Sequence, residues 1–196
     1  MTHLYLTHPQ VVIDPGVPVP DWRLSEAGQA RIVALAASGA LAGFDRIVTS
    51  AERKAIETGE ILAAALALPL EQDADMGEND RSATGYLPSE AFEAAADAFF
   101  AEPDTSFRGW ETARAAQARI VAAVDRRIAT HPGARLILVG HGAVGTLLRC
   151  HLARRPIARA EDQTGGQGGC IYRFDWPDCV PPPRWAPCES LIPDAA

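Results

Sequence analysis

Short apolar segments alternate with helix-patterned segments along this 196-residue chain. The clearest apolar segment, residues 135–139 (Arg-Leu-Ile-Leu-Val), runs into Gly140-His141-Gly142, and a helical pattern follows from 143 to 153. A short continuous apolar run between helical patterns is typical of a parallel strand that is buried on both faces. The alternation therefore predicts an α/β fold, a three-layer sandwich in which helices flank a mostly parallel central sheet.

The same pattern predicts the remaining elements. Further strands are expected at residues 4–7, 44–48, 68–72 and 170–174. Ser25 and Ser50 are expected to cap two helices, because serine at this position accepts a hydrogen bond from a free helical N–H group. Two more helices are expected at residues 88–100 and 110–130, and two long loops at 9–21 and 73–87.

Composition limits the class of protein. The chain is 47% hydrophobic and 22% charged and shows no internal repeat, so we expect one globular domain over residues 1–196. Its formal net charge of −7, with no basic run, argues against a nucleic-acid or anionic-membrane partner. No apolar stretch approaches the ~18 residues of a membrane span, and no signal peptide is recognised, so a soluble, cytoplasmic protein is expected.

The four cysteines do not indicate a metal site. They are Cys150, Cys170, Cys179 and Cys188, and none forms a Cys-x-x-Cys pair. This spacing is neither that of a zinc site nor that of a dense disulfide framework. We interpret them as small core residues or reduced thiols, with a disulfide near the C-terminus as the alternative.

Two histidines occupy equivalent positions in the predicted sheet. His8 follows the first strand, and His141 follows the clearest strand and opens a helix. The carboxyl ends of parallel strands are where α/β proteins bind ligands, and the N–H groups of a helix start suit phosphate. We therefore expect both imidazoles to reach one phosphate-sized ion, with Ser50 at a third strand end. Taken alone, each histidine could equally be structural.

At these residues the chain resembles the histidine phosphatase superfamily, the phosphoglycerate-mutase-like proteins. The resemblance rests on six segments that occur in the family's order. They are residues 4–9 (LYLTHP) at the family's Arg-His-Gly, 24–28 (LSEAG) at Leu-Thr-x-x-Gly, 49–58 (TSAERKAIET) at Ser-Ser-Pro-Leu-x-Arg-Ala-x-Gln-Thr, 76–78 (MGE) at Leu-x-Glu, 109–111 (GWE) at Gly-Glu-Ser, and 139–142 (VGHG) at the second histidine motif. The resemblance implies the phosphoglycerate mutase-like fold.

The resemblance also implies a mechanism with roles for three residues. Neutral His8 would attack phosphorus and form a phosphohistidine, and His141 would donate a hydrogen bond to the phosphoryl oxygens. Glu78 would give a proton to the leaving oxygen and later take one from water. No metal or other cofactor is implied, because cationic side chains take its place. Without the resemblance, the simpler interpretation of Glu78 is a solvated loop residue.

The chain departs from the family at two phosphate-binding arginines. Thr7 stands where the family has the arginine before its first histidine, and Lys54 stands at the second. Lysine keeps the charge but loses the bidentate fork, whereas threonine offers a single hydroxyl. Arg81 and Arg23 are candidate replacements. We expect Thr7, Lys54, Arg81 and Gly142 to bind phosphate.

Two functions follow from this mixture of retained and lost residues. Retention of His8, Glu78 and His141 favours a metal-independent phosphomonoesterase acting on a small phosphorylated substrate. Loss of both arginines favours a weak or inactive relative that binds a phosphorylated ligand, a phosphate ion or a protein partner. An intramolecular mutase is a third reading, less favoured because the chain is short. A homodimer is left open, because the side chains that could lie in the core or at an interface include Trp110, Trp176 and Trp185.

Overall fold

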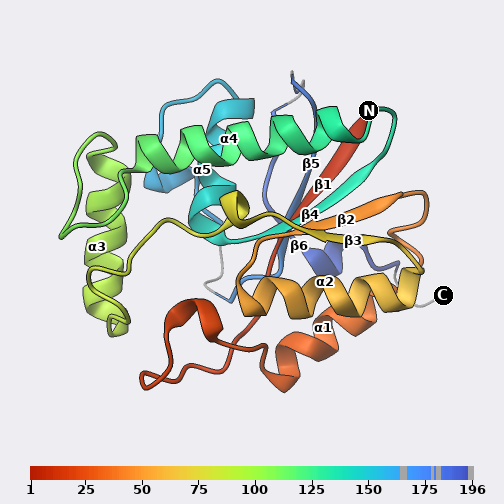
Figure 1. The fold of residues 1–196 in the computed structure, drawn as a ribbon, viewed down its shortest axis with the longest axis horizontal. Helices are drawn as coiled ribbons and strands as arrows, with labels where there is room; N and C mark the ends of the chain where they lie inside the picture. The colour runs from red at the N-terminus through yellow and green to blue at the C-terminus, as the bar shows by residue number, and fades with distance from the viewer. Residues whose placement is uncertain (164–166, 178, 180–181, 194–196) are drawn as a thin grey trace.

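The computed structural model describes residues 1–163, 167–177, 179 and 182–193, and its centre is a sheet (Figure 1). The six strands of the sheet lie in the order β3-β2-β4-β1-β5-β6. They are β1 (Thr2–Thr7), β2 (Arg46–Thr49), β3 (Leu70–Gln72), β4 (Leu136–Gly140), β5 (Cys170–Asp175) and β6 (Ala186–Pro187). The first four in spatial order are parallel, whereas β5 and β6 are antiparallel to their neighbours. The predicted mostly parallel sheet is confirmed, and the antiparallel β5 and β6 make it mixed.

The described residues also form five α-helices. They are α1 (Glu26–Ala37), α2 (Arg53–Leu66), α3 (Ser89–Ala101), α4 (Ala113–Thr130) and α5 (Gly142–Leu152), with 3-10 turns at Val19–Asp21, Ala74–Met76, Arg159–Glu161 and Cys188–Leu191. Ser25 caps α1 as expected, because its hydroxyl accepts the Gly28 amide at 3.1 Å. The second cap was predicted wrongly. Glu52 precedes α2, and the Ser50 hydroxyl instead contacts the His141 ring.

Helices cover both faces of the sheet, which gives the three-layer sandwich. Leu4 and Leu6 pack in the cluster that includes residues of α1 and α2, whereas Tyr5 packs in the cluster that includes α4 and α5. The strand β4 alternates in the same way, because successive side chains of a strand point to opposite faces. Its Ile137 and Val139 join the first cluster, and its Leu136 and Leu138 join the second.

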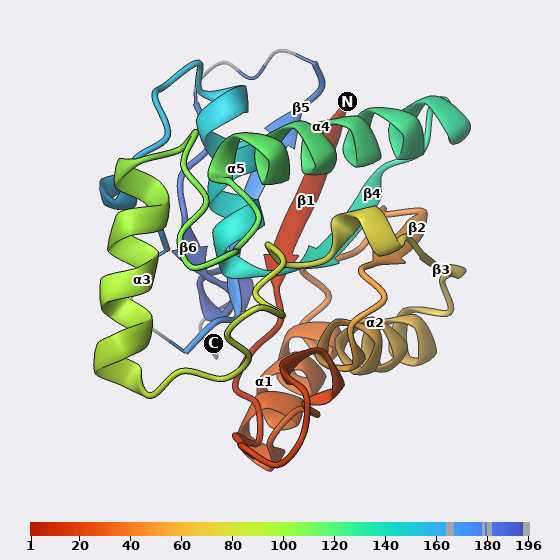
Figure 2. The same cartoon turned by 60° about the vertical axis from the view of Figure 1, so that its left-hand side comes forward.

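The carboxyl ends of three neighbouring strands meet at one edge of the sheet. Thr7 pairs with Gly140, Thr49 pairs with Val139, and the amide of His8 donates to the Gly140 carbonyl at 3.0 Å. The segments that follow β1, β2 and β4 therefore start side by side. The helix α3 lies beside this edge rather than over a sheet face (Figures 1 and 2). Residues of α3 and residues at the strand ends line one cavity.

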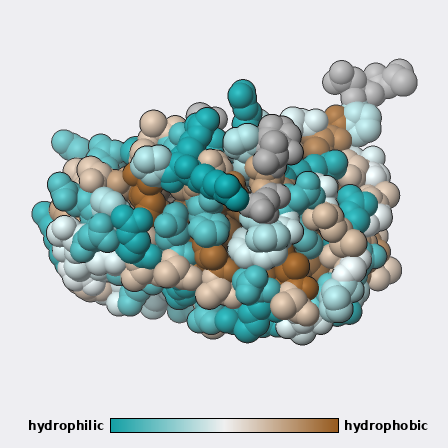
Figure 3. Space-filling model, turned by 90° about the horizontal axis from the view of Figure 1, so that it is seen from above, coloured by the Kyte–Doolittle hydropathy of each residue, from teal (hydrophilic) through white to brown (hydrophobic). Residues whose placement is uncertain are grey.

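The surface over α4 is mixed in character. Figure 3 shows mainly hydrophilic residues on this face, with hydrophobic ones in small separate areas. Trp110 is buried in the core, and Trp185 packs edge-on against Tyr172 with 4.7 Å between ring centroids. These two tryptophans therefore serve the interior of the chain. Among the described helices, none is both long and apolar enough to cross a membrane.

Candidate active site

His8 lies directly after β1 and is only partly exposed. Its Nδ1 is 2.8 Å from the Pro9 carbonyl oxygen. A carbonyl can only accept, so this contact assigns the proton to Nδ1 and leaves the lone pair on Nε2. Burial, together with the charge of Lys54, lowers the pKa of His8 to about 4. The imidazole is therefore neutral at pH 7 and has an unprotonated nitrogen, as a nucleophile requires.

His141 faces His8 from the start of α5. The two ring centroids are 5.2 Å apart, close enough for both imidazoles to contact one phosphate-sized ion. The backbone of His141 is held in place by Tyr5, whose hydroxyl accepts from its N–H and donates to its carbonyl, each at 3.1 Å. The Nε2 atom lies 2.7 Å from the Ser50 hydroxyl. Burial lowers the pKa of His141, which keeps this ring neutral as well.

A cavity of about 760 Å³ opens between His8 and α3. Its lining includes five of the seven residues that the sequence predicted for the site, namely Thr7, His8, Glu78, Arg81 and Gly142. Lys54 lines an adjoining cavity of about 370 Å³, and His141 is fully buried next to His8. Among the described residues, no group of three or more His, Cys, Asp and Glu side chains could hold a metal ion.

Glu78 binds the start of α5 rather than projecting freely into the cavity. Its two carboxylate oxygens accept the amides of Ala143 at 3.2 Å and Val144 at 3.1 Å. Burial raises the pKa of Glu78, with the negative charge of Glu52 adding to the rise against an opposing effect of Arg81. The carboxyl group is therefore more readily protonated than an ordinary glutamate, which suits a proton donor.

Thr7 is occupied by structural hydrogen bonds. Its hydroxyl accepts the Cys170 amide at 2.9 Å and lies 3.0 Å from the Gln163 side-chain oxygen. It therefore binds β1 to β5 and to Gln163, and it replaces neither the charge nor the reach of an arginine. Gln163 lines the cavity beside Gly142, where a Cβ atom on that glycine would approach the Gln163 amide nitrogen to 2.4 Å. Sequence reasoning missed Gln163.

Comparison with known proteins settles the family. The profile of the histidine phosphatase superfamily (branch 1) matches residues 17–182. The chain belongs to the histidine phosphatase superfamily. The matched range contains Lys54, Glu78 and His141 but begins after His8, so the position of His8 rests on the structure and on the degraded first motif. No curated protein sequence matches the chain significantly.

Several solved structures share the fold. Mycobacterial glucosyl-3-phosphoglycerate phosphatase is 22% identical with a TM-score of 0.73, covering 94% of this chain and 95% of its own. The protein YhfR of Bacillus stearothermophilus is 20% identical with a TM-score of 0.77 (91% and 93% covered). Phosphoserine phosphatase of Entamoeba histolytica is 15% identical with a TM-score of 0.70 (89% and 90%). At these identities the likeness establishes the fold.

Lys54, at the second arginine position of the histidine phosphatases, is buried and already paired. Its Nζ donates to the Val19 carbonyl at 2.8 Å and to a carboxylate oxygen of Glu52. The other oxygen of Glu52 lies 3.3 Å from His141 Nε2. Sequence reasoning missed Glu52, although the signal was present, because an acidic residue stands here at the leucine of the family motif.

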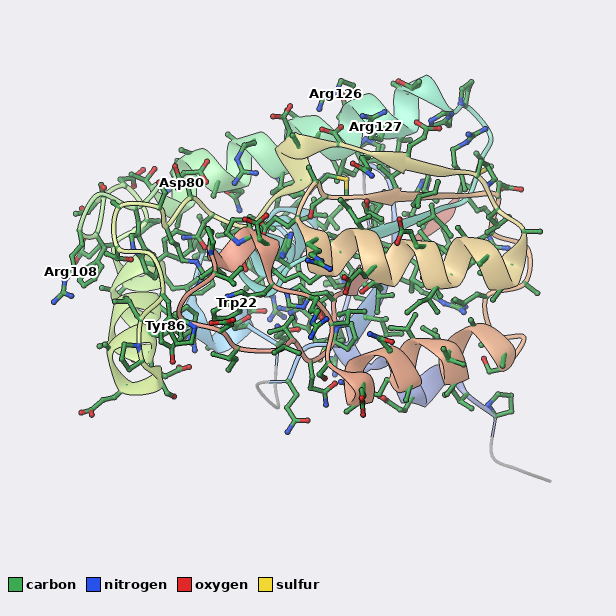
Figure 4. The ribbon with its side chains drawn as sticks, turned by 60° about the horizontal axis from the view of Figure 1, so that its bottom comes forward. Trp22, Asp80, Tyr86, Arg108, Arg126 and Arg127 are labelled. Atoms are coloured by element: carbon green, nitrogen blue, oxygen red, sulfur yellow. The ribbon has the colours of Figure 1, made fainter. Side chains whose placement is uncertain are left out.

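Two arginines line the cavity, Arg81 and Arg159, and Arg159 is paired with Glu93 and Asp162. The guanidinium of Arg81 lies over the rings of Phe92 and Trp110, 5.1 Å and 5.7 Å from their centroids, and no carboxylate forms a salt bridge with it among the described residues. Arg126 and Arg127 on α4 are, by contrast, both paired with Asp73. They lie well away from Tyr86, which lines the adjoining cavity (Figure 4). The other candidate replacement, Arg23, is exposed to solvent.

Arg119 holds the loop that carries Glu78. Its guanidinium donates to the carbonyls of Asp75, Gly77 and Glu78 at 2.8–3.1 Å and pairs with Glu111 at 2.7 Å. Burial alone would lower the pKa of Arg119, but the hydrogen bonds and charge of Glu111 outweigh it. The pKa is therefore raised, and the guanidinium stays charged. A single side chain of α4 thus satisfies three backbone carbonyls of the loop, and these hydrogen bonds hold Glu78 in position.

We expect Arg119→Ala to lower the free energy of unfolding by about 1–3 kcal/mol, because several carbonyls lose a charged donor. Amides at residues 76–80 should exchange with solvent faster, while those of the central strands keep their protection. Denaturant unfolding and hydrogen exchange measure the two effects. Arg114→Ala is the matched control, since Arg114 lies on the same helix and forms an exposed pair with Asp104. Equal effects of the two substitutions would contradict the assignment.

Proposed function

We propose that the protein is a phosphatase that hydrolyses a small phosphomonoester through a phosphohistidine on His8, without a metal ion. One observation carries the proposal. His8 is a neutral imidazole whose Nδ1 is fixed by Pro9, so that Nε2 keeps its lone pair, and it lines a cavity next to His141 and Glu78. The family membership, and the phosphatases among its structural neighbours, support this choice.

The proposed reaction has two steps. In the first, His8 Nε2 forms a bond to phosphorus while the bond to the ester oxygen breaks, and Glu78 supplies the proton that the leaving oxygen needs. In the second, water attacks the phosphohistidine, Glu78 takes its proton, and the N–P bond breaks to release phosphate. Charge on the phosphoryl oxygens is compensated by His141 and by cations such as Arg81.

A second function is supported by the charge of the site. Thr7 supplies no positive charge, and Lys54 is neutralised by Glu52. A protein with this site could bind a phosphorylated ligand or partner while turning it over very slowly. A phosphate-release assay over sugar phosphates, nucleotides and phosphopeptides separates the two functions. Turnover of any of them by the wild type supports the phosphatase. If the protein only binds its ligand, the wild type should release no phosphate, and the double variant Thr7→Arg with Lys54→Arg should release some.

If the phosphatase proposal holds, Arg81→Ala should lower kcat/KM by at least ~10-fold, about 1.4 kcal/mol of transition-state stabilisation. The physical reason is that this substitution removes a positive charge that lines the cavity with His8 and is paired with no carboxylate among the described residues. Lys54→Ala should have an effect of similar size, because it leaves the charge of Glu52 uncompensated. Steady-state kinetics on a phosphomonoester measure both. Arg108→Ala is the control, since Arg108 lies over Phe107 outside the cavity lining. Full activity in both test variants would show that other groups supply the charge.

A further inference from the structure

Glu52 contacts two of the groups that the sequence assigned to the phosphoryl group, His141 and Lys54. Its Oε1 atom accepts the Glu78 amide at 2.8 Å and lies 3.3 Å from His141 Nε2, and its Oε2 atom binds Lys54 Nζ. The carboxylate is thus held from three directions, by the loop, by the start of α5 and by α2. Its side chain is 14% exposed, so solvent screens its charge only weakly.

Glu52 also changes the electrostatics of the site relative to the family pattern. Threonine in place of arginine at position 7 removes one positive charge, and glutamate in place of leucine at position 52 adds one negative charge. Together these two substitutions lower the formal charge of the site by two units relative to the family pattern. The charged and titratable groups around Glu52 include Tyr5, His8, His141, Lys54, Arg81 and Glu78. Both imidazoles are neutral, and so is Tyr5, whose pKa is raised by burial. Two cations thus face two carboxyl groups.

We propose that Glu52 is a specificity-determining residue, which makes the site select a phosphoryl group with one negative charge over one with two. The carboxylate and the phosphoryl oxygens need the same donors and repel each other, and each further negative charge on the ligand increases the repulsion. This inference rests on the proposed function, because it concerns the same site. A monoanionic phosphoryl group has two sources, a phosphomonoester protonated below about pH 6 and a phosphodiester.

A purely structural role for Glu52 makes a different prediction. If the carboxylate only anchored Lys54 and the Glu78 loop, neutralising it would loosen the site and weaken the binding of every anion. In the proposed role, neutralising it strengthens the binding of dianions. Burial alone would raise the pKa of Glu52, but the charge of Lys54 and the hydrogen bonds from Lys54 and the Glu78 amide lower it, so Glu52 stays ionised over the pH range of the test.

The test is calorimetric binding of inorganic phosphate and of sulfate at about pH 5 and about pH 8. Phosphate is mainly a monoanion at the lower pH and mainly a dianion at the higher. Sulfate is a dianion at both, and so reports the titration of protein groups such as Glu78. For the wild type, we expect phosphate to bind at least ~10-fold more tightly at the lower pH after correction by sulfate. Glu52→Gln should bind phosphate at least ~10-fold more tightly than the wild type at the higher pH.

Glu60→Gln is the matched control, because Glu60 lies on α2, the helix that Glu52 precedes, and its side chain is exposed. It should bind both anions as the wild type does. Glu52→Leu, which restores the family residue, provides a second variant, and thermal unfolding establishes that each variant is folded. Dimethyl phosphate distinguishes the two sources. If dimethyl phosphate binds at about pH 8, the preferred ligand is a phosphodiester. If it does not bind, the preferred ligand is a protonated phosphomonoester.

The proposal is overturned if both folded Glu52 variants bind phosphate at about pH 8 no better than the wild type, or if the wild type shows no preference for the monoanion. Because binding is measured without turnover, this failure is separate from a failure of the phosphatase proposal. Absence of a phosphohistidine would refute the reaction while leaving the measured anion preference intact.

Discussion

Replacing His8 with alanine is expected to abolish phosphate release, with a fall in kcat of at least ~10³-fold, because the attacking nitrogen is lost. The wild type, mixed briefly with p-nitrophenyl phosphate and quenched, should carry one phosphate that is labile in acid and stable in base. The variant should carry none. Because the pKa of His8 is about 4, labelling of the wild type should persist at about pH 5, where an ordinary histidine is mostly protonated.

The control for this experiment is His151→Ala. His151 is an exposed histidine on α5 that stacks on Trp176, so its loss tests for non-specific labelling of imidazole. It should leave both the label and the turnover unchanged. Unaltered turnover by a folded His8→Ala protein would rule out the phosphohistidine mechanism. Loss of activity on adding EDTA would instead indicate a metal-dependent reaction.

The backbone of the site was predictable because it depends on local patterns. The apolar runs before His8 and His141 fix two parallel strands, and their adjacency in the sheet brings the two rings to 5.2 Å. Helix boundaries were less predictable. The helical pattern continues back to Trp110, but α4 begins at Ala113, because Thr112 caps it through the Ala115 amide.

The side-chain partners were not predictable in this way. Thr7 and Gln163 are separated by 156 positions in the chain, and nothing in either local pattern indicates that they meet. The structure likewise places Glu78 against the first amides of α5, which the position of Glu78 in a polar loop did not suggest. Local sequence fixes where the strands end, whereas the long-range contacts between side chains decide which charges remain available to a ligand.

Glu78→Gln should lower kcat for an alkyl phosphomonoester by about 10²–10⁴-fold, the range expected when a positioned general acid is removed. Glutamine keeps the side-chain length and one carbonyl oxygen for the amides of Ala143 and Val144, but it carries no acidic proton. An alkoxide is a poor leaving group and needs that proton. A p-nitrophenolate leaves without one, so turnover of p-nitrophenyl phosphate should fall much less.

The dependence of the rate on pH is a second test of Glu78 as the proton donor. Burial raises the pKa of Glu78, so wild-type turnover of the alkyl ester should decline as pH rises through that pKa, at a higher pH than an ordinary glutamate would give. Glu78→Gln should lose this decline. Glu90→Gln, an exposed residue of α3, is the control and should behave as the wild type. Equal losses on the alkyl and p-nitrophenyl esters would show that Glu78 acts by capping α5, because a lost cap disturbs the site whatever the leaving group.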